Sequence, residues 1–159
     1  MVINSPHPVA MARALRANWR QIRRSWYIFA FQLPWLPERL LARDRARAIR
    51  DTLRRSAATG TLSDEDLAVY ARAFAATAAI NYYRAAFRAG PRLRAPRIGA
   101  PTLVIWGEDD FALGKELTFG MERLFSGELR IAYLPRTSQW VMEERPAEVN
   151  KLLLDFLAR

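Results

Sequence analysis

The sequence predicts an α/β fold in which a helical region, residues 1–95, precedes a β-α-β-α unit of a parallel sheet, residues 96–159. Two observations lead to this prediction. Apolar residues recur at helical spacing over most of the first 90 residues, whereas residues 102–106 form a continuous apolar run. Such a run is typical of a parallel strand that is covered on both faces, and a second strand is predicted at Leu129–Leu134.

The first two helices are predicted on either side of a proline-bounded bend. The first covers residues 9–26, where four apolar residues follow a helical period, namely Leu15, Trp19, Ile22 and Trp26. Pro34 and Pro37 predict the bend, because proline cannot continue the interior of a helix. Apolar residues between 40 and 53 then predict the second helix.

Two further helices are predicted before the sheet. Ser63, followed by three acidic residues, is a favourable helix N-cap, because carboxylates complement the free N–H groups of a first turn. The next helix is predicted over residues 78–87, and the glycines and prolines of residues 90–99 predict a connector.

The C-terminal region is predicted to hold one helix after each strand, at residues 117–125 and at Pro146–Leu157. Parallel strands joined in this way form a right-handed crossover. Two strands cannot cover both faces of the first one, and only residues 1–3 could supply part of a third. We therefore expect something outside these 159 residues to complete the sheet.

The composition excludes several kinds of site. The chain has no cysteine and only one histidine, His7, so it cannot form a disulfide or a thiolate zinc site, and we expect no metal and no cofactor. No apolar run approaches the about 20 residues that span a bilayer, and the N-terminal segment lacks the features of a secretory signal. We therefore expect a cytoplasmic protein with no membrane partner.

The net charge of +9 is unevenly distributed: residues 1–100 carry +12 and residues 101–159 carry −3. The arginines between Arg13 and Arg24 could bind a polyanion, but no groove-reading motif accompanies them. A solvated helix face is the favoured interpretation, and no nucleic-acid partner is expected.

Polar residues follow both predicted strands. Asp110 comes just after the first strand, and Gln139 follows the second. Because open α/β sheets place functional groups at the carboxyl ends of their strands, we expect these two residues to lie close together. An acidic turn that caps the next helix is the structural alternative for Asp110.

Several segments together resemble the C-terminal part of an α/β-hydrolase. They are PTLVIWGEDD at 101–110, YLPRTSQW at 133–140 and ERPAEVN at 144–150. Two more, SWYIFAFQLP at 25–34 and NYYR at 81–84, look like the lid of the epoxide hydrolase branch. The resemblance runs from NSPHP at 4–8 to the end of the chain, and it implies a partial α/β-hydrolase fold with a helical cap or lid.

The resemblance also implies roles for individual residues. In epoxide hydrolases an aspartate attacks an epoxide carbon while two lid tyrosines donate to the ring oxygen, and a histidine oriented by a second acid activates water. Tyr27 and Tyr83 match the lid tyrosines, and Asp110 matches the orienting acid. Tyr83 is preferred to Tyr82 because it directly precedes Arg84, as in the pattern of the family.

Two departures from the family pattern bear on activity. Gln139 stands where the family has the histidine, and an amide cannot accept a proton near neutral pH. No glycine-flanked Asp or Ser forms a nucleophile elbow before the lid. We therefore expect a truncated hydrolase that is inactive alone, unless a separate N-terminal half or self-association completes it. The alternative is a non-catalytic remnant that binds a small apolar ligand or another protein.

The expected ligand is a small apolar epoxide or a similar molecule. Five aromatic residues of the lid region could line its pocket or form ordinary core, namely Trp19, Trp26, Phe29, Phe31 and Trp35. His7 is expected to be a surface or capping residue with no part in catalysis.

Overall fold

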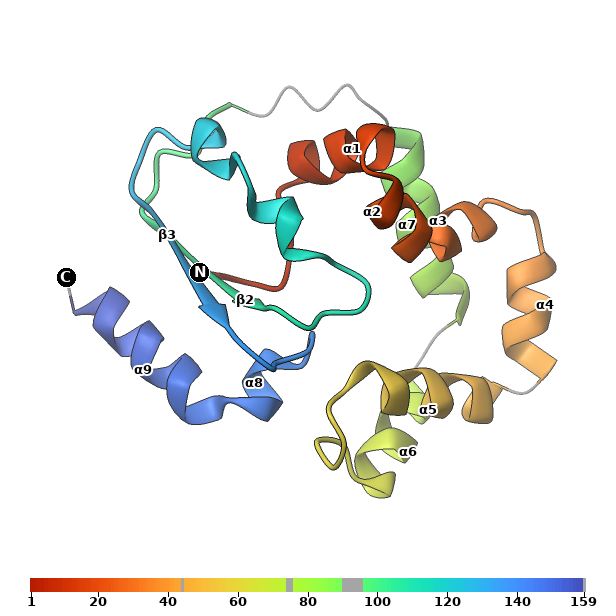
Figure 1. Ribbon diagram of the computed structural model, residues 1–159. Helices are drawn as coiled ribbons and strands as arrows, with labels where there is room; N and C mark the ends of the chain where they lie inside the picture. Colours follow the sequence, from red (N-terminus) through yellow and green to blue (C-terminus); the bar gives the residue numbers. More distant parts are fainter. Residues whose placement is uncertain (44, 74–75, 90–95, 159) are drawn as a thin grey trace.

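The computed structural model describes residues 1–43, 45–73, 76–89 and 96–158, and shows helices packed around and beside a small parallel sheet (Figure 1). Its strands are β1 (Val2–Ile3), β2 (Thr102–Gly107) and β3 (Leu129–Leu134). They lie in the order β1-β2-β3, with both pairs parallel. Val2 pairs with Val104, which pairs in turn with Ile131, so β2 is the central strand.

The helices that precede β2 in the chain are α1 (Pro8–Ala17), α2 (Trp19–Arg24), α3 (Trp26–Ala30), α4 (Leu36–Arg43), α5 (Arg45–Ser56), α6 (Asp64–Ala73) and α7 (Ala76–Ala89). The 3-10 helices η2 (Lys115–Thr118) and η3 (Met121–Leu124) connect β2 to β3. The helices after β3 are α8 (Val141–Glu144) and α9 (Pro146–Leu157).

The prediction of a strand covered on both faces is confirmed for β2. Val104 and Trp106 pack on one side with residues of α1, η2 and η3. Leu103 and Ile105 pack on the other side with residues of α8 and α9. All six residues of β2 are buried, which explains why its sequence shows no alternation of apolar and polar residues.

The first helical segment packs with the sheet, although residues 1–95 were predicted as one helical region. β1 is a strand of the sheet, and Ala10 of α1 belongs to the same buried cluster as Trp106. The helices α4, α5 and α6 lie to one side of the sheet in Figure 1, where α5 packs on α6 and α4 on α7. α1 therefore packs with the sheet, and the boundary predicted at residue 95 stays a prediction.

The single helix predicted over residues 9–26 is wrong, because the chain breaks twice. Asn18 has an extended backbone, and its side-chain oxygen accepts hydrogen bonds from the N–H groups of Arg20 and Gln21. It is thus the N-cap of α2, a role that favours asparagine. The break also turns Trp19 and Trp26 toward solvent, where they are 64% and 66% exposed, instead of into the predicted apolar face.

Residues 117–125 were also predicted incorrectly as one α-helix. The segment forms η2 and η3, which are separated by Gly120 in the left-handed region at φ 74°. Glycine adopts this conformation without the steric penalty of a side chain, and the turn prevents one continuous helix. The connection between β2 and β3 is therefore made of short 3-10 turns.

Other predicted elements are confirmed. At the start of α6 the Asp66 N–H donates to the Ser63 hydroxyl, and the Ser63 N–H donates back to the Asp66 carboxylate, as in a capping box. α7 and α9 lie where helices were predicted, and residues 90–95 of the predicted connector are outside the described residues. Within the described ranges no helix combines the length and the apolarity that crossing a membrane requires.

Trp106 is completely buried, and within the described residues its indole N–H has no hydrogen-bond partner. An unpaired buried donor costs about 1–3 kcal/mol, so Trp106→Phe should lose packing but remove this penalty. We expect Trp106→Phe to change the free energy of unfolding by about 1 kcal/mol or less and Trp106→Ala to lower it by about 3–5 kcal/mol. Urea unfolding measures both values, and equal losses in the two variants would contradict the prediction.

Candidate functional site

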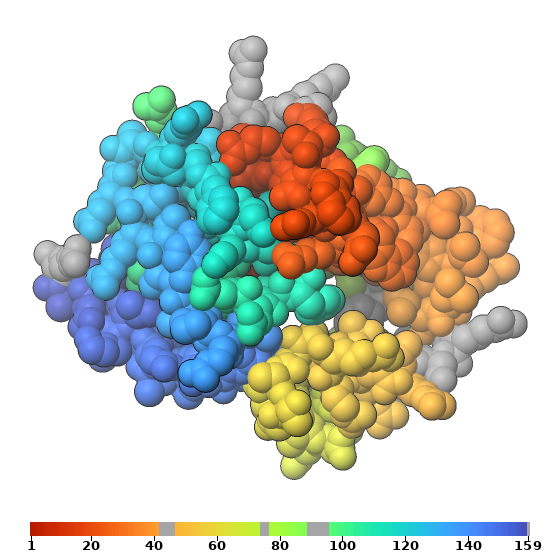
Figure 2. All heavy atoms as spheres, viewed as in Figure 1, coloured from red at the N-terminus to blue at the C-terminus, as the bar shows by residue number. Residues whose placement is uncertain are grey.

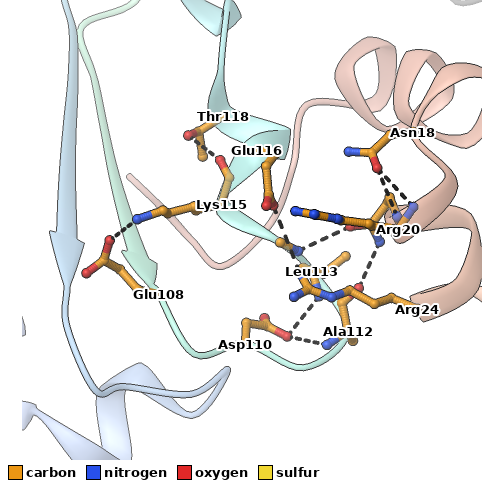
Figure 3. Close-up of polar contacts among 12 residues, drawn as sticks. Asn18, Arg20, Arg24, Glu108, Asp110, Ala112, Leu113, Lys115, Glu116 and Thr118 are labelled. Atoms are coloured by element: carbon orange, nitrogen blue, oxygen red, sulfur yellow. Dashed lines mark hydrogen bonds and ion pairs between the residues drawn. The ribbon is translucent and has the colours of Figure 1, made fainter.

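Asp110 lies in the loop after β2, where it is almost fully buried. One carboxylate oxygen accepts hydrogen bonds from the backbone N–H groups of Ala112 and Leu113, at 2.8 and 2.9 Å, so the loop folds around this side chain (Figure 3). Burial raises the pKa of Asp110 above its usual value, although these N–H groups, Asn4 and Arg24 act in the opposite direction. The structure thus holds a carboxylate in a fixed position at the end of the central strand.

Asn4 is the residue that joins the strand ends, and it was not singled out from the sequence. Its side-chain amide donates to the second oxygen of Asp110 at 3.0 Å and to the carbonyl of Ser138 at 3.2 Å. Its side-chain oxygen accepts from the N–H of Gly107 at 2.7 Å. One buried side chain at the end of β1 therefore fixes the loops that follow β2 and β3.

A local signal for Asn4 exists in the sequence. Asn4 follows a short apolar segment directly and is followed by Pro6 and Pro8. In the structure it has a positive φ of 39°, a conformation that asparagine adopts more easily than most residues. A polar residue at a strand end, beside a proline-rich turn, is therefore a candidate for such a junction.

The loop after β3 lies directly against the end of β2. A Cβ atom on Gly107 would be 2.1 Å from the carbonyl oxygen of Ser138, so only glycine fits at this position. Ser138 is buried, and its N–H donates to the carboxylate of Glu144 at 2.8 Å. Gln139 follows it in the loop, is exposed, and receives no hydrogen bond on its side chain from the described residues.

The structure therefore brings together the loops that carry Asp110 and Gln139, through the shared donor Asn4. It fixes the two side chains very differently. The Asp110 carboxylate accepts three hydrogen bonds, whereas Gln139 is exposed and its amide accepts none from the described residues.

Tyr27 and Tyr83 lie beside each other on different helices. Their rings, on α3 and α7, have centroids 5.5 Å apart and are nearly perpendicular at 88°. Phe31 packs against both rings: its ring centroid lies 5.8 Å from that of Tyr27 and 5.4 Å from that of Tyr83. The neighbouring Tyr82 also packs against Tyr83, with ring centroids 5.5 Å apart, but it is 72% exposed, whereas the two tyrosines chosen from the sequence are partly buried.

The pKa of Tyr27 is raised well above its usual value. Burial is the main cause, followed by the neighbouring Tyr83 and, more weakly, by the negative charge of Asp110. Tyr27 is therefore a neutral phenol at physiological pH.

Arg84 fixes the helices that carry the two tyrosines. Its guanidinium donates to the carbonyls of Phe31 at 2.9 Å and Leu33 at 2.7 Å, and it forms an ion pair with Glu38. The hydrogen bond from Arg84 is the main cause that lowers the pKa of Glu38. Because Arg84 directly follows Tyr83, this set of contacts ties α7 to the chain segment that follows Tyr27.

Four of the five aromatic residues considered for a pocket are exposed in this structure. Trp19, Trp26, Trp35 and Phe29 are 64%, 66%, 61% and 40% exposed, so the core interpretation does not hold for them, and the pocket interpretation stays a prediction. Phe31 alone joins the tyrosine cluster. Since helical spacing says which residues share a face but not what covers that face, the sequence could not settle this point.

His7 is a capping residue, as expected. Its Nδ1 atom accepts a hydrogen bond from the N–H of Val9 at 3.1 Å, at the start of α1, and partial burial lowers its pKa. In the part of the chain that the structure describes, no group of three acidic or histidine side chains is arranged to hold a metal ion.

No protein-family model matches the chain. It is 38% identical to epoxide hydrolase 3 of Mus musculus over an alignment of 144 positions, which covers 86% of this chain and 39% of that protein. It is 34% identical to epoxide hydrolase 3 of Xenopus tropicalis over an alignment of 167 positions, which covers 99% of this chain and 45% of that protein. This chain therefore spans less than half of the length of either curated relative.

A solved structure, that of Bacillus megaterium epoxide hydrolase in complex with an inhibitor, resembles the fold over 99% of this chain and 59% of that one. The TM-score is 0.81 and the sequence identity is 24%.

Proposed function

This chain corresponds to the C-terminal part of an epoxide hydrolase-like α/β-hydrolase, and from that premise we propose that it provides the proton-donating side of an epoxide-opening site. The observation that supports the proposal most directly is the packing of the Tyr27 ring against the Tyr83 ring, with centroids 5.5 Å apart. The proposed ligand is a small apolar epoxide. Its ring oxygen would accept hydrogen bonds from the two phenols.

The opening of an epoxide ring needs a proton donor, and the phenols are suited to this role. When a carboxylate oxygen attacks an epoxide carbon, the carbon–oxygen bond breaks and the ring oxygen needs a proton to become a hydroxyl. Because Tyr27 has a raised pKa, it is neutral at physiological pH and keeps the proton that it would donate. Arg84 holds both tyrosine-bearing segments and so acts as a positioning residue.

The second half of the reaction is hydrolysis of the resulting ester by water, which gives the diol. This step needs a base at position 139, and Gln139 cannot accept a proton near neutral pH. We therefore propose that the purified 159-residue chain binds epoxides without converting them to diols. The proposal assigns the attacking carboxylate to a segment that would extend the sheet beyond β1.

Two single-atom changes test the tyrosine pair. We expect Tyr27→Phe and Tyr83→Phe each to weaken the binding of an aryl epoxide about fivefold, because each removes one hydrogen bond worth about 1 kcal/mol. Ligand-observed NMR titration of the purified chain with styrene oxide measures the affinities.

Tyr82→Phe is the matched control, because Tyr82 is adjacent in sequence but largely exposed. It should bind styrene oxide as the parent chain does. If all three variants bind equally well, or if the parent chain does not bind the epoxide, the proposed role of the phenol pair is refuted.

A further inference from the structure

A cavity lies where α5 and the following residues meet the loops after β2 and β3. It has a volume of about 220 Å³ and is lined by residues 55–58 together with Asp109, Phe111, Arg136 and Ser138. Figure 2 shows the α5–α6 segment packed against the loops at the strand ends. This volume is smaller than that of pockets for drug-sized ligands. The cavity could therefore hold one small functional group.

Hydrogen bonds between the helical region and the strand-end loops hold the walls of this cavity. The Glu144 carboxylate accepts from the N–H of Ala58 at 2.9 Å and from the N–H of Ser138 at 2.8 Å. The indole N–H of Trp140 donates to the hydroxyl of Ser56 at 2.8 Å. The opposite walls are therefore tied together, and the cavity is a built feature of the fold.

Two arginines contribute positive charge to the lining. Arg55 and Arg136 are exposed, and neither forms an ion pair within the described residues. Arg136 also has a positive φ of 52°, a conformation that is unfavourable for a non-glycine residue and that is often found at functional sites. Asp109 is the one acidic side chain in the lining.

We propose that this cavity binds an oxyanion, the carboxylate or phosphate group of a small molecule, through Arg55 and Arg136. A guanidinium presents paired N–H donors that match two oxygens of such a group. Phe111 also lines the cavity and offers an apolar surface for the rest of the molecule. This site is separate from the tyrosine pair, so it does not depend on the function proposed above.

The test is a titration of the purified chain with inorganic phosphate and, separately, with acetate at low ionic strength, followed by ¹H–¹⁵N NMR. We expect saturable shifts at residues of the cavity, and we expect Arg55→Gln and Arg136→Gln each to weaken binding about tenfold. Tighter binding of phosphate indicates a phosphorylated ligand, and tighter binding of acetate indicates a carboxylate.

Two further variants test whether binding depends on the charge of the cavity and whether it takes place there. Asp109→Asn should tighten anion binding about twofold to fivefold, because it removes a nearby negative charge without changing the shape of the side chain. Arg72→Gln is the control for net charge, since Arg72 is exposed on α6 and is not part of the cavity lining. The proposal is overturned if neither anion saturates, if Arg72→Gln weakens binding as much as the cavity variants, or if Asp109→Asn weakens it.

Discussion

Gln139→His is expected to introduce an imidazole whose pKa lies above the usual value for histidine. Position 139 directly follows Ser138, whose carbonyl shares the amide donor of Asn4 with the Asp110 carboxylate. A histidine there would lie near a buried, fixed negative charge, which stabilises the imidazolium form. NMR titration of the variant measures this pKa, and His7, whose pKa is lowered by burial, is an internal reference in the same sample.

The same substitution should have a large effect on turnover once a nucleophile is present. A positioned general base typically contributes about 10²–10⁴-fold to a rate. In a chimera that joins this chain to the remaining N-terminal portion of the mouse relative, we expect Gln139→His to raise diol formation by about that factor. Gln139→Asn is the matched control and should leave the rate unchanged. Equal rates for the histidine and asparagine variants would contradict the role assigned to position 139.

Asn4→Asp is expected to destabilise the fold strongly, although it hardly changes the shape of the side chain. The asparagine amide that donates to Asp110 at 3.0 Å would become a second carboxylate in a buried site. Two like charges at this distance cannot both remain ionised without a large penalty. We expect the free energy of unfolding at neutral pH to fall by about 3–5 kcal/mol, as when one partner of a buried charged pair is lost.

The destabilisation of Asn4→Asp should depend on pH in a defined direction. The pKa of Asp110 is already raised in the folded chain, and a second carboxylate would raise it further. The pKa of this carboxyl is about 4 in the unfolded chain and higher in the folded chain. At pH values between these two pKa values, the native state binds more protons than the unfolded state. The stability contribution is therefore greatest below the pKa of the unfolded chain, and it is lost as the pH rises through the pKa of the folded chain.

Asn4→Ala separates this charge effect from the loss of hydrogen bonds. It removes the contacts of Asn4 with Asp110 and Gly107 but adds no charge, so its stability loss should vary much less with pH than that of Asn4→Asp. Urea unfolding of both variants between pH 4 and pH 8 measures the difference. Parallel pH profiles for the two variants would show that the side chain at position 4 does not interact electrostatically with Asp110.

The buried network around Asn4 also explains why Asp110 is held so firmly. The carboxylate accepts from two backbone N–H groups of its own loop and from one side chain of another strand. A buried carboxylate with three donors is oriented before any partner arrives, which is the property that a supporting acid needs. The proposed role of Asp110 therefore rests on packing at the strand ends as much as on its place in the sequence.

Local patterns in the sequence determined much of the fold. The continuous apolar run gave β2, Ser63 and the acids after it gave the start of α6, and Pro146 marked the start of α9. These features act within a few residues of each other, so the sequence contains all the information that they need. The resemblance to a known family added the tyrosine pair and Asp110, which no periodicity would have distinguished.

Only the tertiary structure decided how distant residues meet. Asn4 contacts Asp110 and Ser138, which lie 106 and 134 positions away, and Arg84 reaches carbonyls of another helical segment 53 and 51 positions away. The same is true of the exposed tryptophans and of the cavity between Arg55 and Arg136. Each depends on the relative placement of whole elements, which is set by the burial of their combined apolar surfaces and is not encoded by the spacing within any one of them.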